Sequence, residues 1–228
     1  MPVEKIAVAA SGGVDSLVTT CLLKNAGYNV CAVHFTTGFE ENNTDNLLKI
    51  DELYRQIGVE LEILDFSGPF RKHVVEYFAA AYRQGLTPNP CMLCNPTVKF
   101  GLLLEHALAK SCTKLATGHY ASIKETGGVF GLYKGLDQNK DQSYFLAMLS
   151  QRQLSQTLFP LGEMQKNDVK ALAAEFGVAP IQKNESQDIC FIKGDYVDFL
   201  QGRLGFKPRK GPVKRTDGKV IGEHNGLY

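Results

Sequence analysis

The chain has 228 residues, of which 44% are hydrophobic and 21% charged, with a formal net charge of +1 at pH 7. These values are ordinary for a globular protein of one large domain, or of one domain with an appendage. They argue against a wholly basic surface that coats nucleic acid. No apolar run approaches the roughly 20 residues of a membrane helix, so we expect no membrane association.

The N-terminal stretch "MPVEKIAVAA" has an acid and a base directly before a strand-like run, which is unlike a secretory signal. We therefore expect a cytoplasmic protein. In that reducing compartment the six cysteines are better candidates for metal binding or catalysis than for structural disulfides.

Strand and helix patterns alternate from the amino terminus. The expected strands are residues 5–10, 28–35, 59–66 and 114–120, and the expected helices are residues 14–26, 46–57, 70–83 and 98–110. Repeated strand–helix–strand units predict an α/β fold with a doubly wound parallel sheet, because each parallel crossover needs a long right-handed connection.

The pattern changes in the second half of the chain. Residues 122–135 predict a hairpin that turns at Gly127 and Gly128. Two shorter helical stretches are expected at residues 143–154 and 166–176. Residues 203–219 then carry seven basic residues and one acid, which fits either a solvated loop or a phosphate-binding segment.

The first sequence motif is "AASGGVDS", residues 9–16, between an expected strand and an expected helix. Gly12 and Gly13 allow the backbone to approach an anion, and the helix that follows adds its positive end. Ser11 and Ser16 offer hydroxyls, and Asp15 can hold a magnesium ion bound to phosphate oxygens. No lysine follows the glycines, so this is not the phosphate loop of kinases and GTPases.

The string "SGGVDS" resembles the loop of the ATP pyrophosphatase superfamily. That resemblance implies cleavage of ATP between the α and β phosphates and formation of an adenylate on a substrate oxygen. It indicates the chemistry and leaves the substrate open.

Three cysteines are candidates for sulfur or metal chemistry: Cys91 and Cys94 in a loop, and Cys190 in "ESQDICFI". A thiolate is a good nucleophile and can carry a persulfide. We interpret Cys21, Cys31 and Cys112 as small buried hydrophobic residues.

The motifs "SGGVDS", "TPNPCMLCNPTVKFG", "ATGHYA", "KDQSYFL" and "ESQDICFI" resemble, in order and spacing, the tRNA-specific 2-thiouridylase (MnmA) family. The resemblance covers roughly residues 5–228. It implies a sulfurtransferase that adenylates O2 of the wobble uridine of tRNAs for Lys, Glu and Gln, replaces that oxygen with sulfur at C2, and releases AMP and pyrophosphate. It also implies ATP, Mg²⁺, tRNA, a protein that donates persulfide sulfur, and a Rossmann-like sheet of the adenine nucleotide alpha hydrolase type.

The same resemblance assigns residues by position. The implied ATP contacts are Ala9, Ala10, Ser11, Gly12, Gly13, Val14, Asp15, Ser16, Phe35 and Gly118. The implied target-base contacts are Asn89, Pro90 and Cys91, and the implied tRNA contacts are Lys140, Asp141 and Gln142. Cys190 matches the persulfide carrier, and Cys94 matches the partner that frees the sulfur and leaves a Cys94–Cys190 disulfide.

Cys91 departs from the family, because many members have an aspartate there. A thiol titrates near ~8.5 and an aspartate near ~3.9, so the two groups differ in proton transfer. Cys91, Cys94 and Cys190 could instead hold an iron–sulfur cluster, or zinc together with His119 or water. His119 otherwise fits a hydrogen-bonded structural residue, and Lys99 fits either a solvated side chain or a cation that acts on phosphate or a thiol.

The family normally continues through a central domain and a C-terminal β-barrel, whereas this sequence ends at Tyr228. We therefore expect a catalytic domain over residues 1–200, followed at 201–228 by a basic linker and the start of a truncated central domain. Two alternative functions stay open at this point: sulfur transfer to a small molecule, and a non-catalytic metal- or nucleotide-binding module.

Overall fold

The computed structural model describes residues 3–40, 43–181, 189–192 and 194–226. Its centre is a parallel sheet in the order β3-β2-β1-β4-β7, the arrangement expected for a doubly wound fold. The strands are β1 (Lys5–Ala9), β2 (Asn29–Thr36), β3 (Leu61–Asp65), β4 (Lys114–Ala116) and β7 (Thr157–Leu158). In the described part of the chain no helix is both long and apolar enough to cross a membrane.

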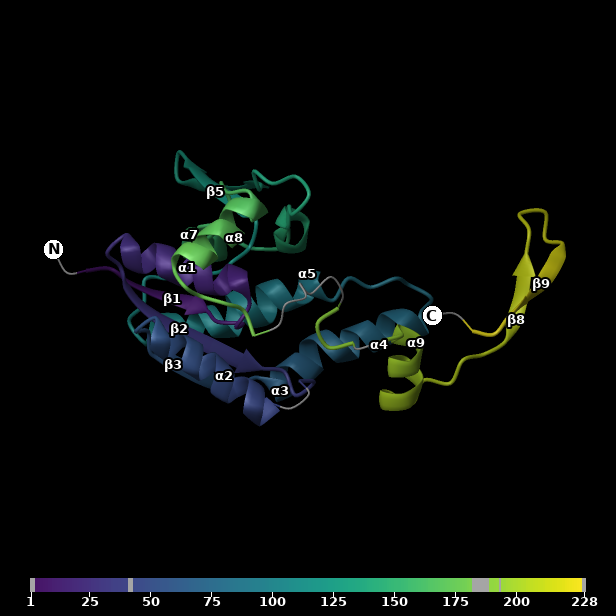
Figure 1. Ribbon diagram of the computed structural model, residues 1–228. Coiled ribbons are helices and arrows are strands. Elements are labelled where there is room, and N and C mark those ends of the chain that lie inside the picture. Colours follow the sequence, from purple (N-terminus) through teal and green to yellow (C-terminus); the bar gives the residue numbers. More distant parts are fainter. Residues whose placement is uncertain (1–2, 41–42, 182–188, 193, 227–228) are drawn as a thin grey trace.

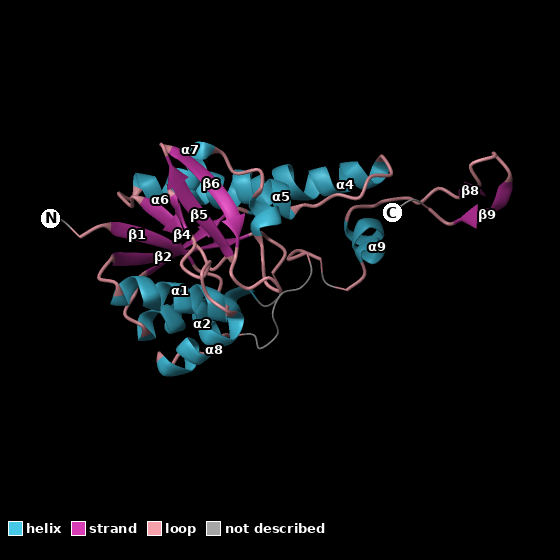
Figure 2. Ribbon diagram, turned by 90° about the horizontal axis from the view of Figure 1, so that it is seen from above, coloured by secondary structure: helices cyan, strands magenta, loops and turns pink. Residues whose placement is uncertain are grey.

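Helices cover both faces of this sheet (Figure 2). One face carries α1 (Val14–Asn25), α2 (Asn43–Gln56) and α8 (Lys166–Glu175). The other carries α6 (Leu104–Ala109) and α7 (Gln151–Ser155). Each layer has its own buried cluster, with Leu17, Tyr54 and Val169 in the first and Leu103, Leu115 and Leu154 in the second. Burial on both faces explains why the central strand β1, in which Ile6, Ala7 and Val8 are fully buried, is an apolar run without alternation.

Two long helical rods extend beyond the sheet on the side of α4 (Glu76–Arg83) and α5 (Cys91–Cys94) (Figure 1). Each rod contains a π-helical stretch. The first is formed by α3 (Ser67–Phe70), η1 (Arg71–Val75) and α4. The second is formed by α5, η2 (Asn95–Leu103) and α6. The sequence predicted that this second helix starts near Val98 and that Cys91 and Cys94 lie in a loop. That prediction was wrong, because the helix begins at Cys91.

Pro96 explains why the second rod contains a π turn. Proline has no N–H to donate, so the ladder of a regular helix is interrupted there. The side-chain amide of Gln153 donates to the carbonyls of Pro96 (2.7 Å) and Phe100 (2.9 Å), which satisfies two acceptors of the widened turn. The helix therefore continues through a position where sequence rules would end it.

The hairpin predicted around Gly127 and Gly128 is present as β5 (Ala121–Thr126) and β6 (Val129–Lys134). Both glycines have positive φ, 60° and 81°, as a two-residue turn of this kind requires. The single helix expected at residues 143–154 is instead two pieces, η3 (Ser143–Leu146) and α7. Ser150 separates them by forming a capping box with Gln153.

The C-terminal part begins with α9 (Tyr196–Asp198) and η4 (Phe199–Arg203). Leu204 and Phe206 pack against the third buried cluster, around Phe70, Phe78 and Phe191. A hairpin of β8 (Gly211–Lys214) and β9 (Val220–His224) follows and stands away from the sheet beyond α9 (Figure 1). The sequence predicted strand character only for the second of these strands.

Candidate functional site

The glycine-containing loop lies where β1 ends and α1 begins, at the carboxyl edge of the sheet. Gly12 has a φ of 72°, which favours glycine, and Gly13 is extended at the helix N-cap. The Ser16 hydroxyl donates to the Gly13 carbonyl (2.9 Å), and the Ser11 hydroxyl donates to Ser16 Oγ (3.1 Å). The loop is therefore held in shape by its own hydroxyls at a helix N-terminus, which suits a phosphate group.

Asp15, predicted to hold magnesium, has protein partners instead. Both of its carboxylate oxygens accept hydrogen bonds from Lys166 Nζ, each at 2.8 Å, and Oδ1 also accepts one from the Tyr120 hydroxyl at 2.8 Å. The Lys166 side chain is 6% exposed and that of Asp15 is 31% exposed. In this arrangement the buried Lys166 compensates the charge of Asp15. The magnesium role of Asp15 stays a prediction.

Gly118 packs directly on the phosphate loop. A Cβ at this position would lie 2.8 Å from the backbone carbon and from the Cβ of Asp15. The glycine predicted as an ATP contact is thus required by a close approach of the two loops after β1 and β4. This contact joins the phosphate loop to the "TGHY" segment.

Two residues of β2 adjoin the same loop. His34 Nδ1 donates to the Ala10 carbonyl at 2.6 Å, and burial lowers the pKa of His34, so the ring is neutral and offers Nε2 as an acceptor. Phe35, the other predicted nucleotide contact, packs its ring against Phe66 with centroids 5.5 Å apart. Both side chains lie at the end of β2, beside β1 and its loop.

The cysteine motif is held at the first turn of the second helical rod. Asn89 Oδ1 accepts a hydrogen bond from the Cys91 N–H at 3.2 Å, and the Pro90 carbonyl accepts one from the Cys94 N–H at 2.9 Å. Asn89 and Pro90, predicted to meet the target base, therefore also start the helix. Cys91 and Cys94 are both half-buried.

Cys190 lies near the cysteine motif although it is far from it in the sequence, because its neighbour Phe191 packs in the buried cluster that Cys94 also contacts. The residue is exposed, and its neighbour Phe191 is buried at 3% exposure among the rings of Phe70, Phe78 and Phe199. These edge and tilted ring contacts anchor the backbone next to Cys190. Most of the predicted "ESQDICFI" segment before it lies outside the described residues.

Lys99 is the cation that acts on all three thiols. Desolvation by the surrounding protein is the largest effect and raises the pKa of Cys91, Cys94 and Cys190 above the usual thiol range, while the charge of Lys99 lowers each of them. Cys94 and Cys91 also raise the pKa of Cys190, so the three thiols are within electrostatic range of one another. The resting thiols are therefore protonated, and Lys99 is the charge that favours their thiolates.

His119 holds Lys99 in place. Lys99 Nζ lies 3.4 Å from His119 Nε2, and His119 Nδ1 lies 2.6 Å from Thr117 Oγ1. Desolvation and the charge of Lys99 lower the pKa of His119 well below its usual value, so the ring is neutral. Nδ1 then donates to Thr117 and Nε2 accepts from Lys99, which makes His119 a hydrogen-bonded structural residue, as expected. Because His119 follows Gly118, it connects the phosphate loop to the thiols.

The three cysteines do not form a metal site in the arrangement observed. Among the described residues, which include all three thiols, no group of three or more His, Cys, Asp or Glu side chains is placed to hold a metal ion. The donor set has the chemistry for an iron–sulfur cluster or zinc, but its geometry here fits neither.

The predicted tRNA segment, Lys140, Asp141 and Gln142, folds back on the protein. Asp141 Oδ1 accepts from the N–H groups of Gly135 (3.0 Å) and Ser143 (3.2 Å), and Gln142 Oε1 accepts from the Tyr120 N–H (3.1 Å). Burial opposes ionisation of Asp141, but these hydrogen bonds outweigh it and lower its pKa. Two of the three residues thus shape the turn before η3.

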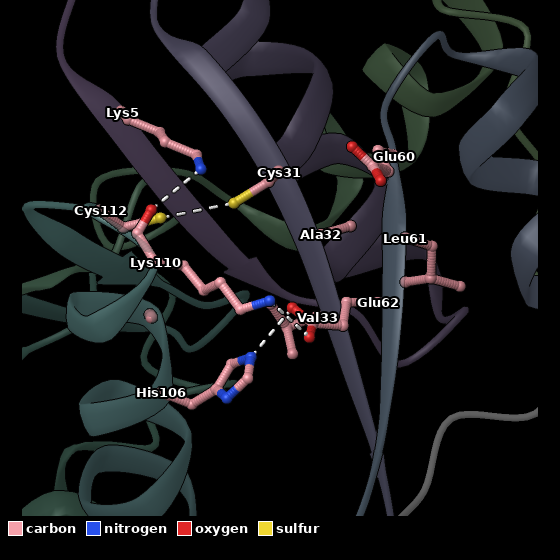
Figure 3. A pocket seen from close by; sticks show the side chains of 11 residues that line it. Lys5, Cys31, Ala32, Val33, Glu60, Leu61, Glu62, His106, Lys110 and Cys112 are labelled. Atoms are coloured by element: carbon pink, nitrogen blue, oxygen red, sulfur yellow. Dashed lines mark hydrogen bonds and ion pairs between the residues drawn. The ribbon is translucent and has the colours of Figure 1, made fainter.

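A separate cavity of about 290 Å³ lies at the amino-terminal ends of the strands, away from the phosphate loop (Figure 3). Figure 3 shows the sulfur atoms of Cys31 and Cys112, 3.4 Å apart, pointing toward one another. Burial, followed by the contact with Cys112, raises the pKa of Cys31 to about 12. In the same cavity Glu62 pairs with His106 and Lys110. With the Cys31 thiol protonated and Glu62 engaged by two side chains, the cavity is not the candidate reaction site.

Sequence reasoning missed Lys166, Tyr120 and His34, although each contacts the phosphate loop. Lys166 lies 151 positions from Asp15 along the chain, and no local pattern marks it. The residue Tyr120 was within the quoted "TGHY" motif, but only the fold shows that its hydroxyl reaches Asp15.

Curated relatives of the chain share one name. The tRNA-specific 2-thiouridylase MnmA of Desulfosudis oleivorans is 45% identical over 225 residues, covering 98% of this chain and 62% of the relative. That of Ralstonia pickettii is 43% identical, covering 100% of this chain and 63% of the relative. The chain thus spans a little under two thirds of the length of these relatives.

Among solved structures, the U34-tRNA thiolase NcsA from Methanococcus maripaludis with its [4Fe-4S] cluster matches with a TM-score of 0.54 at 21% identity. The match covers 88% of this chain and 67% of that chain and shows a shared fold. Residues 4–194 match the family described as the tRNA methyl transferase HUP domain. The chain therefore belongs to this family, and its resemblance to the tRNA-specific 2-thiouridylase MnmA family is confirmed.

Proposed function

We propose that this chain is the catalytic part of an ATP-dependent tRNA sulfurtransferase that converts the wobble uridine of tRNAs for Lys, Glu and Gln to 2-thiouridine. The observation that carries the proposal is a series of contacts that links the phosphate loop to the three thiols. The phosphate loop contacts Gly118, the next residue His119 holds Lys99, and Lys99 acts on Cys91, Cys94 and Cys190.

The proposed reaction begins at the phosphate loop. O2 of the uridine attacks the α-phosphorus of ATP, the bond to the β-phosphate breaks, and pyrophosphate leaves. The loop amides, the Ser11 and Ser16 hydroxyls and the N-terminus of α1 bind the phosphates. ATP is the cosubstrate, and Mg²⁺ bound to its phosphates would further neutralise their charge.

Sulfur transfer follows at the thiols. A donor protein supplies sulfur to Cys190 as a persulfide, whose terminal sulfur attacks C2 and displaces AMP. The Cys94 thiolate then attacks the Cys190 sulfur, which releases the thiolated base and leaves a Cys94–Cys190 disulfide for an external thiol to reduce. Lys99 supports the thiolate forms, and Cys91 lies beside the base in place of an aspartate.

We favour this persulfide relay over an iron–sulfur cluster because no described group of side chains has metal-ligand geometry. Anaerobic purification followed by assays of iron, acid-labile sulfide and zinc separates the two routes. Iron and sulfide that disappear in Cys91→Ser would replace the relay by a cluster. Zinc lost in the same variant would indicate a structural clamp.

The proposal is tested by pyrophosphate release. With ATP and unmodified tRNA, the protein should release pyrophosphate at a rate that depends on tRNA. Cys190→Ser should retain that step and lose thiolation, because adenylation precedes sulfur transfer. Release that is indifferent to tRNA would instead support transfer of sulfur to a small molecule. Tight ATP binding without any hydrolysis would support a non-catalytic module.

A further inference from the structure

The short helix η3 presents an aromatic side chain to solvent beside the cysteine motif. The polar residues Asp141 and Gln142 are used internally, in hydrogen bonds to Gly135, Ser143 and Tyr120. The next large side chain, Tyr144, is 54% exposed. More than half of this aromatic side chain is therefore accessible from solvent.

The position of Tyr144 is fixed from two sides. Its ring lies 3.9 Å from that of Phe145, centroid to centroid. The Phe145 carbonyl accepts a hydrogen bond from the side-chain amide of Asn95 at 2.9 Å, and Asn95 is the buried residue that follows Cys94. The η3 turn and α5 are therefore in direct contact, and Tyr144 is held next to the cysteine motif.

Among the residues of the cysteine motif, Cys91 has an electrostatic effect on the pKa of Tyr144. Desolvation, and after it the charges of Cys91 and Asp141, raise the pKa of Tyr144. The phenol is therefore neutral at physiological pH, and its ring is an uncharged, polarisable surface beside the thiol that stands at the target base.

We propose that Tyr144 is the platform on which the target uracil ring stacks when it is turned out of the anticodon loop. This inference rests on the proposed function and identifies how the base is held. A base that leaves its own stack loses stacking energy, and an aromatic ring at the reaction site restores it. Tyr144 acts as a positioning residue, since it takes no part in bond making.

The test compares tRNA affinity with and without the base. Binding is measured for the full chain as wild type, Tyr144→Leu and Tyr144→Phe. Each protein is titrated with an unmodified tRNA and with the same tRNA that has an abasic site at the wobble position. We expect Tyr144→Leu to weaken binding of the intact tRNA about ten- to one-hundredfold, the range for one stacked base, and to leave the abasic tRNA unchanged. Tyr144→Phe should bind both like wild type, because it keeps the ring.

Tyr133→Leu is the matched control, because Tyr133 is a similarly exposed tyrosine (48%) on β6. It should bind both tRNAs like wild type. Equal losses with both tRNAs, or no loss with Tyr144→Leu, would overturn the stacking role while leaving the proposed function intact. Reduced ATP affinity in Tyr144→Leu would also overturn it, since the platform would then serve the nucleotide. No measurable tRNA binding by the wild type would overturn the proposed function, and the stacking role with it.

Discussion

The ion pair between Lys166 and Asp15 gives the most direct prediction about stability. Replacing Lys166 by methionine keeps the length of the side chain and removes the charge. Asp15 then loses two hydrogen bonds of 2.8 Å and keeps, among the described residues, the one from the Tyr120 hydroxyl. The change leaves an uncompensated carboxylate at the start of α1.

The size of the effect follows from burial. Removing one member of a fully buried ion pair costs about 3–5 kcal/mol. The Asp15 side chain is 31% exposed, so water recovers part of the lost interaction. We therefore expect Lys166→Met to lower the free energy of unfolding by about 2–3 kcal/mol. For a chain of 228 residues this corresponds to a fall in Tm of about 4–6 °C.

Urea unfolding followed by circular dichroism measures this change. Lys49→Met, an exposed lysine on α2, is the control and should stay within about 0.5 kcal/mol of wild type. The double variant Lys166→Met/Asp15→Asn should recover part of the loss, because the unpaired charge is gone. A Lys166→Met protein as stable as the control would refute the reasoning that this pair stabilises the loop.

Two further predictions concern the same site. Gly118→Ala should destabilise the protein by about 1–3 kcal/mol and weaken ATP binding, because its Cβ would lie 2.8 Å from the Asp15 backbone. Gly68→Ala is the control, because a Cβ at this position would have no atom within 4 Å. Equal stability of the two variants would contradict the close approach. Alkylation of Cys190 by iodoacetamide at pH 8 should be at least about tenfold slower than that of a free thiol. Although the residue as a whole is exposed, desolvation by the surrounding protein and then Cys94 raise its pKa to about 12. Since this folded-state pKa lies above that of an unfolded thiol, its contribution to stability is present below about pH 8.5 and is lost as the pH rises toward 12. Rapid alkylation at neutral pH in the folded protein would contradict the shift.

The local part of the site could be predicted from sequence. Gly12 and Gly13 between an apolar run and a helical pattern predict a glycine turn between a strand and a helix, and the structure has this turn between β1 and α1. Phosphate binding by the turn stays a prediction. The partners of that loop could not be predicted in this way. Lys166 reaches Asp15 across 151 positions and Tyr120 across 105, and only the packing of α8 and the "TGHY" segment on α1 brings them together.

The helix that carries the cysteines shows a second limit. The sequence predicted a loop around Cys91 and Cys94 and a helix that starts near Val98. The helix instead starts at Cys91, and the side-chain amide of Gln153 donates to the carbonyls of Pro96 and Phe100 within the π-helical stretch. The strand β7 was not predicted, because two residues are too few for a periodic pattern to indicate a strand.

The central claim, that this chain takes part in tRNA thiolation through Cys190, is tested most directly by mass spectrometry of nucleosides. The wild-type protein, unmodified tRNA for Lys, ATP, a persulfide donor and a reducing thiol are incubated together, and the tRNA is digested. We expect 2-thiouridine from the wobble position with the wild-type protein and none with Cys190→Ser. Equal amounts of 2-thiouridine from both proteins, or none from wild type while a full-length relative yields it under the same conditions, would contradict the claim.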